Sequence, residues 1–359
     1  MLKPMLITGG CGFVGRHVVK YVLTRGLSDS LWIVDNLFTG RSPDQWLPEY
    51  YTRTPISSTC TAYKGKGATV YFVHDDVRRF FADYIASPVC SDLPRFGDAI
   101  HLASIVGGRS VIDGDPLLVA TDLAIDAEMF QWIRTVKPDR LLYASSSAAY
   151  PIDLQGFGNA VALRESYIQF DGQLGMPDMT YGWSKLTGEY LSRIAARSYG
   201  QHVTCVRPFS GYGEDQEAVY PVPAIAERAA KREDPLVVWG TGQQGRDFVH
   251  IDDCVDFIFK AMDSVSDGSG LNIGSGVLTT FLTVAKMFAE IAGYSPAIRP
   301  LIDKPVGVQN RYADMSVVEA RLHWSPAISI EEGFRRVYDS ACLRLSGKDT
   351  WSSLWTDVD

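Results

Sequence analysis

The chain contains 359 residues, of which 46% are hydrophobic, 21% charged and 11% aromatic, a composition typical of a globular protein. Its 34 basic and 42 acidic side chains give a net charge of −8, which leaves no general basic field for binding a nucleic-acid backbone. No apolar run reaches the roughly 18 residues that a spanning helix needs, and the first residues lead into a short strand pattern rather than a signal-peptide core. We therefore expect a cytoplasmic protein without nucleic-acid or membrane partners.

The first half of the chain alternates short β-branched runs with amphipathic stretches, which predicts a doubly wound α/β fold with a parallel sheet covered on both faces. A polar stretch at 39–67 is too long for an ordinary connection and is predicted to be a surface insertion. The expected strands are 5–8, 31–35, 69–74, 98–103, 140–145 and 202–207. The expected helices are 14–25, closed by Gly26, then 116–136, and 179–199, closed by Gly200.

After Arg207 the pattern changes to that of a smaller mixed lobe. We expect a helix at 223–231, a strand at 236–239 and turns at 240–245, with later helices that begin at capping boxes, Ser316 with Glu319 and Ser329 with Glu332. The predicted division is a large sheet domain at 1–207 with a return at 246–264, a smaller lobe at 208–345 and a tail at 346–359.

The six cysteines show no CxxC pair and no zinc-finger spacing to a histidine, so we expect free thiols and no metal site. They are Cys11, Cys60, Cys90, Cys205, Cys254 and Cys342.

A glycine pattern, TGGCGFVG at 8–15, lies where the first strand gives way to the first helix. Gly9 permits a tight turn, Gly12 lets the backbone approach a pyrophosphate, and Gly15 lets helix and strand pack closely, as in a Rossmann dinucleotide site. Asp35, at the end of the second strand, can accept the ribose hydroxyls and would repel a 2′-phosphate; the next basic residue is Arg41. NAD is therefore predicted over NADP. The other predicted cofactor contacts are Phe13 and Val14 in the glycine motif, Asn36 after Asp35, Asp76 and Val77 near the adenine, and Leu102, Ala103 and Ser104 along the central portion.

Tyr181 and Lys185 are four residues apart and so lie on one face of a helix. A free tyrosine, with a pKa near 10, is only about 0.1% ionised at pH 7, but a neighbouring ammonium and an oxidised nicotinamide both favour the phenolate. This pair predicts a general base for a sugar or alcohol hydroxyl. A serine run at 145–147 follows the fifth strand, where α/β sheets place ligands, and one of its hydroxyls can hydrogen-bond the oxygen being oxidised. Spacing alone does not decide which one.

Taken together, TGGCGFVG, HLAS, SSSAAYP, YGWSK and GRDFVHIDD resemble the extended short-chain dehydrogenase/reductase family of nucleotide-sugar epimerases and dehydratases, which includes UDP-glucose 4-epimerases and GDP-mannose 3,5-epimerases. The resemblance implies a homodimer with a tightly held NAD that removes a hydride from a sugar carbon, usually C4, and later returns it. It implies catalytic roles for Ser146, Tyr181 and Lys185, with Lys185 gripping the nicotinamide ribose. It further implies Pro208 near the nicotinamide, and Ser147, Ser210, Arg246 and Arg311 around the nucleoside diphosphate sugar.

Departures from the family pattern narrow the expected reaction. The Asp-Glu pair of the 4,6-dehydratases is replaced here by Ser147 and Ala148. The 3,5-epimerases use a Cys and a Lys for proton exchange. The position of that Cys holds Ala148 here, and no Lys occurs between Ser210 and Ala230. We therefore expect an NAD-dependent epimerase, most simply a 4-epimerase. A 3,5-epimerase, a uronic acid decarboxylase and a dehydratase remain alternatives, whereas a non-catalytic NAD sensor is disfavoured by the intact catalytic set. At two positions where the family pattern has asparagine, this sequence has Ser210 and Asp122.

Overall fold

The computed structural model describes residues 2–86, 93–107, 109–158, 160–348 and 355. Its centre is a nine-stranded sheet in which the predicted parallel strands all occur. The strands are β1 Met5–Thr8, β2 Ser30–Asp35, β3 Thr52–Pro55, β4 Cys60–Lys64, β5 Thr69–His74, β6 Asp98–His101, β7 Arg140–Ala144, β8 His202–Pro208 and β13 Asp267–Ile273. They lie in the order β13-β8-β7-β6-β1-β2-β5-β4-β3, with parallel pairing from β13 to β5 and antiparallel pairing beyond it.

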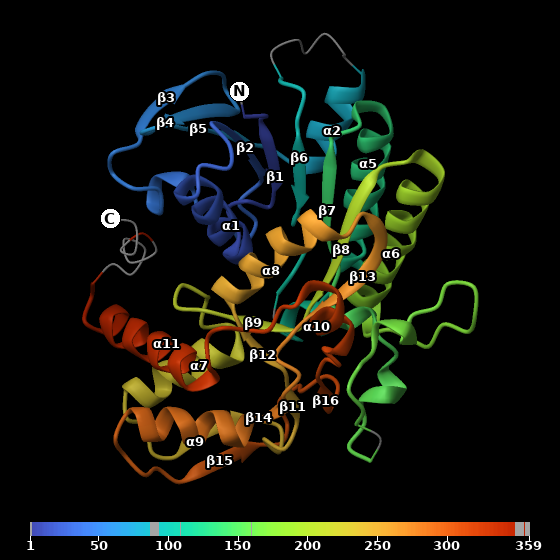
Figure 1. The fold of residues 1–359 in the computed structure, drawn as a ribbon. Coiled ribbons are helices and arrows are strands. Elements are labelled where there is room, and N and C mark those ends of the chain that lie inside the picture. The colour runs from blue at the N-terminus through green and yellow to red at the C-terminus, as the bar shows by residue number, and fades with distance from the viewer. Residues whose placement is uncertain (1, 87–92, 108, 159, 349–354, 356–359) are drawn as a thin grey trace.

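Helices cover both faces of this sheet, which confirms the predicted doubly wound fold. Helices α2 Val77–Ala86, α5 Thr121–Val136 and α6 Met179–Tyr199 lie along one side in Figure 1. Helices α1 Phe13–Thr24 and α8 Ile251–Ser264 contribute buried apolar side chains to a separate core. In the sheet, β2 lies on one side of β1 and β6 on the other, so the strand order reverses between β1 and β6. Folds of this kind have a ligand-binding crevice at the carboxyl ends of the two strands where the order reverses.

One predicted helix is interrupted. The stretch 116–136 forms α4 Pro116–Val119 and then α5, with a break at Ala120. At the break, Leu123 N donates to Ala120 O, a bond across three residues that tightens the turn and ends the regular helical register. A further short helix, α3 Arg109–Gly114, precedes α4.

The predicted insertion at 39–67 adds two strands to the sheet. After the short helix η1 Pro43–Gln45, β3 and β4 form an antiparallel hairpin, and β4 pairs with β5. Trp46 is buried beneath this segment, and its carbonyl accepts a hydrogen bond of 2.5 Å from Trp355 Nε1 in the C-terminal tail. The insertion is therefore packed structure that extends the sheet.

The smaller lobe lies at the lower end of the molecule in Figure 1 and has its own core. Its helices are α7 Pro221–Ala230, α9 Phe281–Ile291 and α11 Ile330–Leu345, which meet through buried Ile225, Phe288 and Phe334. Its short strands are β9 Ser210–Tyr212, β10 Leu236–Trp239, β11 Gly245–Arg246, β12 Phe248–His250, β14 Thr279–Thr280, β15 Ile298–Leu301 and β16 Asn310–Arg311.

Two further expectations need correction. Strand β13 was not predicted, and it pairs with β8 in the large sheet although the sequence analysis places its residues in the smaller lobe. Its glycines hide the strand pattern, and Gly270 is required because a Cβ there would lie 2.6 Å from Arg207 Nε. Helix α10 Ser316–Leu322 is not started by a Ser316 capping box, because Asp314 Oδ1 accepts from Ser316 N instead. Ser329 does cap α11 as predicted, accepting from Glu332 N.

Five of the cysteines are free thiols, as expected, and Cys90 lies outside the described residues. No helix in the described ranges is long and apolar enough to cross a membrane.

Candidate active site

The glycine loop between β1 and α1 forms one wall of the crevice. Gly9 has a φ of +69°, and a Cβ there would lie 2.7 Å from Ala103 N, so the turn packs tightly on the segment after β6. A Cβ on Gly15 would lie 2.3 Å from Gly9 O. Helix α1 begins at Phe13, directly after Gly12, and no described side chain caps its first turn. This cradle, with free N–H groups at a helix N-terminus, fits an anionic diphosphate.

Asp35 connects the end of β2 to that loop. It is largely buried; its Oδ2 accepts from Cys11 N at 2.9 Å and its Oδ1 from Leu37 N at 2.8 Å. Burial raises the pKa of Asp35, although the two backbone donors oppose that effect. Arg41 also approaches the loop, since its N–H donates to Cys11 O, but its guanidinium donates to Glu217 at 2.9 Å.

Asp76 occupies the start of α2, where its Oδ1 accepts from Arg78 N at 2.9 Å. The Arg78 guanidinium also binds this carboxylate and lowers the pKa of Asp76. The structure thus gives Asp76 a helix-capping role, and its predicted contact with adenine stays a prediction. The neighbouring pocket, of about 660 Å³, is lined by Asn36, His74, Asp75, Asp76, Arg78, Arg79, Ala82 and Glu128.

The segment that follows β6 is held by Asp122 of α5. Ser104 Oγ donates to Asp122 Oδ2 at 2.6 Å, and Ile105 N donates to Asp122 Oδ1 at 2.5 Å. Leu102 N donates to Thr8 O, which ties the same segment to β1. Asp122, at the position where the family pattern has asparagine, is therefore a buried carboxylate that fixes the segment after β6. Burial raises the pKa of Asp122.

Tyr181 and Lys185 lie on one face of α6, as predicted. Lys185 is only 3% exposed, and its Nζ lies 5.7 Å from the ring centroid of Tyr181 and 5.7 Å from that of Tyr143. Burial disfavours the charged form of Lys185, but the neighbouring Tyr181, Asp126 and Asp122 raise its pKa overall. A charged ammonium is thus placed beside a half-buried phenol.

The serine run packs on the first turn of α6. Asp178 N donates to Ala148 O at 2.9 Å, and a Cβ on Gly182 would lie 2.4 Å from the same carbonyl, so only glycine allows this approach beside Tyr181. Ser145 Oγ donates to Glu189 Oε1 inside the core, while Ser146 Oγ accepts from Ala148 N at 3.1 Å and keeps its own hydrogen for another acceptor. This difference favours Ser146 over Ser145 as a donor to substrate. Ser147 is buried at the start of η2 Ser147–Ala149.

A fully buried ion pair supports this region from behind. Glu189 of α6 and Arg207 of β8 are both 0% exposed and are joined by bonds of 2.8 and 2.7 Å. Arg207 Nη1 also donates to the Tyr150 hydroxyl, which donates to Asn272 Oδ1 of β13. The pair thereby fixes the relative positions of the Tyr181 helix and the strand that ends at Pro208.

The two predicted diphosphate ligands come from neighbouring strands of the smaller lobe. Arg246 and Arg311 are direct partners in the parallel β11–β16 pairing. Arg246 donates to backbone carbonyls, including Val306 O at 2.9 Å, whereas Arg311 donates to Gln155 and forms an ion pair of 2.8 Å with Asp178 at the start of α6. Ser210, at the start of β9, donates its N–H to Asp247 O.

Comparison with known proteins decides the family. Residues 5–274 match the sequence model of the NAD dependent epimerase/dehydratase family. The chain belongs to this family. CDP-paratose 2-epimerase of Salmonella typhi is 25% identical over 93% of this chain and 98% of its own length, and UDP-N-acetyl-alpha-D-glucosaminuronate decarboxylase of Bacillus cytotoxicus is 26% identical over 93% and 96%. The crystal structure of the dTDP-glucose 4,6-dehydratase DesIV from Streptomyces venezuelae, with NAD bound, superposes with a TM-score of 0.77 at 20% identity and covers 97% and 99% of the two chains.

The protein is accordingly an enzyme of the epimerase/dehydratase family, and NAD dependence is a property that defines this family. These three proteins are named for an epimerisation, a decarboxylation and a dehydration. The likeness therefore establishes the family and leaves the reaction to be argued from the site.

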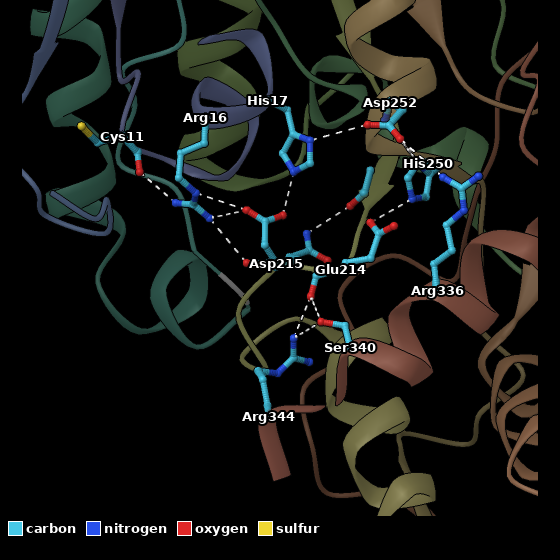
Figure 2. A network of polar contacts seen from close by, with 12 residues as sticks. Cys11, Arg16, His17, Glu214, Asp215, His250, Asp252, Arg336, Ser340 and Arg344 are labelled. Carbon is cyan, nitrogen blue, oxygen red and sulfur yellow. Dashed lines mark hydrogen bonds and ion pairs between the residues drawn. The ribbon is translucent and has the colours of Figure 1, made fainter. Parts of the chain in front are cut away.

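In this family member, a buried ionic cluster joins the glycine loop to the smaller lobe (Figure 2). Arg16 donates to Asp215 Oδ2 at 2.9 Å and to Cys11 O at 2.9 Å, and His17 Nε2 contacts Asp215 Oδ1 at 2.7 Å. Burial disfavours a charged His17, yet Asp215 raises its pKa to about 9. His17 Nδ1 also lies 3.6 Å from Asp252 Oδ1.

The cluster continues to the C-terminal helix. His250 Nδ1 accepts from Asp252 N and so caps α8, while its Nε2 contacts Glu214 Oε2 at 3.1 Å. Ser340 and Arg344 of α11 both donate to Glu214 O. His250 and Asp252 thus tie the two lobes together. Arg16, His17 and Asp215 were not predicted as members of a cluster, although the two charged side chains Arg16 and His17 within the apolar pattern of α1 are a usable signal.

Proposed function

We propose that this chain is an NAD-dependent epimerase of a nucleoside diphosphate sugar that acts through a transient 4-keto sugar, most simply a 4-epimerase. The observation that supports the proposal most is the packing of the serine run on the first turn of α6, because Ala148, two residues after Ser146, approaches Gly182, the neighbour of Tyr181. The positions after Ser146 hold Ser147 and Ala148, which offer no additional acid and base for a second proton transfer. A reaction that needs only one acid–base group fits this site.

The residues of the crevice fit NAD. The Gly9–Gly15 loop would hold the diphosphate, Asp35 the adenosine ribose, and Lys185 the nicotinamide ribose. Bound there, NAD would supply the hydride-transfer chemistry at C4 of the sugar. The ion pair between Arg41 and Glu217 supports NAD over NADP, because it engages the first guanidinium that follows Asp35 in the sequence, which a 2′-phosphate could otherwise use.

Side chains of this enzyme transfer the proton of the sugar's C4 hydroxyl. Tyr181, as phenolate, accepts the proton of the C4 hydroxyl, while Ser146 donates a hydrogen bond to that oxygen and Lys185 stabilises the phenolate. Arg246 and Arg311 anchor the diphosphate, so the sugar can rotate without leaving. Tyr181 then returns the same proton to the oxygen, and the base is regenerated.

Incubation in heavy water with a panel of UDP-, GDP-, CDP- and dTDP-sugars, followed by NMR, tests the proposal. A 4-epimerase that returns its hydride gives a C4 epimer without carbon-bound deuterium. Deuterium at C3 or C5 would instead identify a 3,5-epimerase, release of carbon dioxide a uronic acid decarboxylase, and loss of water a dehydratase.

A tyrosine pair on α6 tests the proposed base. Tyr181→Phe is expected to abolish turnover and to retain NAD, whereas Tyr199→Phe, at an exposed position on the same helix, is expected to keep both. Turnover that survives in Tyr181→Phe would remove Tyr181 from the mechanism.

We also propose that the enzyme is a homodimer formed through α5 and α6. Both helices expose large apolar side chains, Leu123 on α5 and Trp183 and Tyr190 on α6. Light scattering of the purified protein at micromolar concentration is expected to give twice the mass of 39.6 kDa, and a monomer mass would refute this assembly.

A further inference from the structure

Lys185 is a buried cation that makes no direct contact with an anion. Among the described residues, its ammonium has no hydrogen bond and no ion pair, although the side chain is only 3% exposed. A buried lysine without support tends to lose its proton. The charged form of Lys185 must therefore be stabilised by groups that do not contact its ammonium directly.

That support comes from two carboxylates on α5. Asp122 and Asp126 are separated by one helical turn, so both face the sheet and α6. Their exposures are 1% and 2%, and both contribute to raising the pKa of Lys185. The ionisable and aromatic groups around the ammonium are Tyr181 of α6, Asp122 and Asp126 of α5, Tyr143 of β7 and Cys205 of β8.

Both carboxylates are already held by other donors. Asp122 accepts from Ser104 Oγ and Ile105 N. Asp126 contacts His101 Nε2 at 3.2 Å and accepts from the Tyr143 hydroxyl at 2.6 Å. These bonds fix the carboxylates in place, so their charge acts on Lys185 while its N–H groups remain unused.

We propose that Asp122 and Asp126 are positioning residues that keep Lys185 charged without contacting it, so that the ammonium's donors serve the cofactor ribose and Tyr181. This inference rests on the proposed function of Lys185. It assigns a role to the acidic residue found where the family pattern has asparagine.

The Asp122→Asn variant separates charge from shape. Its amide oxygen can still accept from Ile105 N, and its NH₂ can donate to Ser104 Oγ, so the packing is kept while one negative charge is lost. Without that charge, Lys185 loses its proton more easily. The alkaline limb of the pH–rate profile should therefore move to lower pH, by about one unit. Asp122→Glu should restore the original profile.

Asp115→Asn is the matched control, because it removes an exposed carboxylate at the start of α4 that solvent screens. It should leave the profile in place. If Asp122→Asn lowered the rate at every pH without moving the alkaline limb, the inference would be overturned. Should Asp122→Asn not fold, Asp126→Asn is expected to shift the profile in the same direction, and an unshifted profile there would equally overturn it.

A second readout does not depend on turnover. NAD affinity is measured by calorimetric titration across the alkaline pH range, where it should fall as Lys185 loses its proton. The pH at which half of the affinity is lost should be about one unit lower in the Asp122→Asn variant; an unchanged pH dependence would overturn the inference. If no sugar of the panel reacts, the proposed function fails, while this titration still decides the role of Asp122.

Discussion

Replacement of His17 by Gln tests the buried cluster of Figure 2 through its dependence on pH. In the folded protein the pKa of His17 is about 9, against an ordinary value of 6.5. The charged ring is therefore favoured in the folded state by about 3 kcal/mol, from the difference between these values at 1.36 kcal/mol per unit. This contribution is complete below pH 6.5, falls as the pH rises, and is lost above about pH 9. Gln can still donate to Asp215 but cannot titrate.

The assay is urea unfolding of the wild type and of His17→Gln, at about pH 6 and about pH 10. Subtraction of the two free energies of unfolding removes every group that both proteins share. The advantage of the wild type should shrink by about 3 kcal/mol between these two pH values. If the difference between the proteins stayed constant, His17 would not be charged in the folded state, and the electrostatic account of the cluster would be wrong.

Three further substitutions test the loop and the core. Gly15→Ala places a Cβ 2.3 Å from Gly9 O, so we expect a loss of about 1–3 kcal/mol of stability in urea unfolding and loss of NAD from the purified protein. Glu189→Gln leaves the guanidinium of Arg207 buried without its partner charge and should cost about 3–5 kcal/mol in the same unfolding assay. Asp35→Asn turns an NH₂ toward one of two backbone donors, and calorimetric titration should show NAD affinity reduced by about tenfold with weaker discrimination against NADP.

For each of these three predictions, one experimental result would contradict the reasoning. Gly156→Ala, at an open position, is the control for Gly15→Ala, and equal behaviour of the two would mean that the close approach in the glycine loop is unimportant. A loss below 1 kcal/mol for Glu189→Gln would show that water reaches Arg207. If Asp35→Asn kept the same preference for NAD over NADP, a residue other than Asp35 would be responsible for that preference.

The large sheet was predictable because its strands carry strong local signals. The apolar runs of β1, β2, β7 and β8 are short, those of β1, β2 and β8 contain β-branched residues, and Gly26 and Gly200 mark the ends of helices α1 and α6. The strand β13 was missed because Gly268 and Gly270 dilute its pattern. The reason for these glycines is visible only in the structure, where Gly268 lies against the backbone of Ser192 and Gly270 against the guanidinium of Arg207. The break between α4 and α5 at Ala120 contains no proline or glycine, so the sequence carried no signal that predicted it.

The candidate site was predictable where one segment carries the chemistry. Tyr181 and Lys185 lie on a single helix, and the glycine loop is continuous in sequence. The roles of Asp122, Asp126 and Asp215 depend on partners from other elements, and a single sequence does not contain those pairings. The same holds for the serine run, because the contacts that separate Ser145 from Ser146 come from Glu189 and Ala148.

The hairpin at 39–67 makes β3 the free border of the nine-stranded sheet, with all four of its residues exposed. Such a border invites strands of other molecules to join it. Pro55 lacks an N–H to offer, and Arg53 brings a charge that an incoming strand would have to cover. The hairpin thus gives the buried parallel strands a neighbour and leaves outermost a segment poorly suited to intermolecular aggregation.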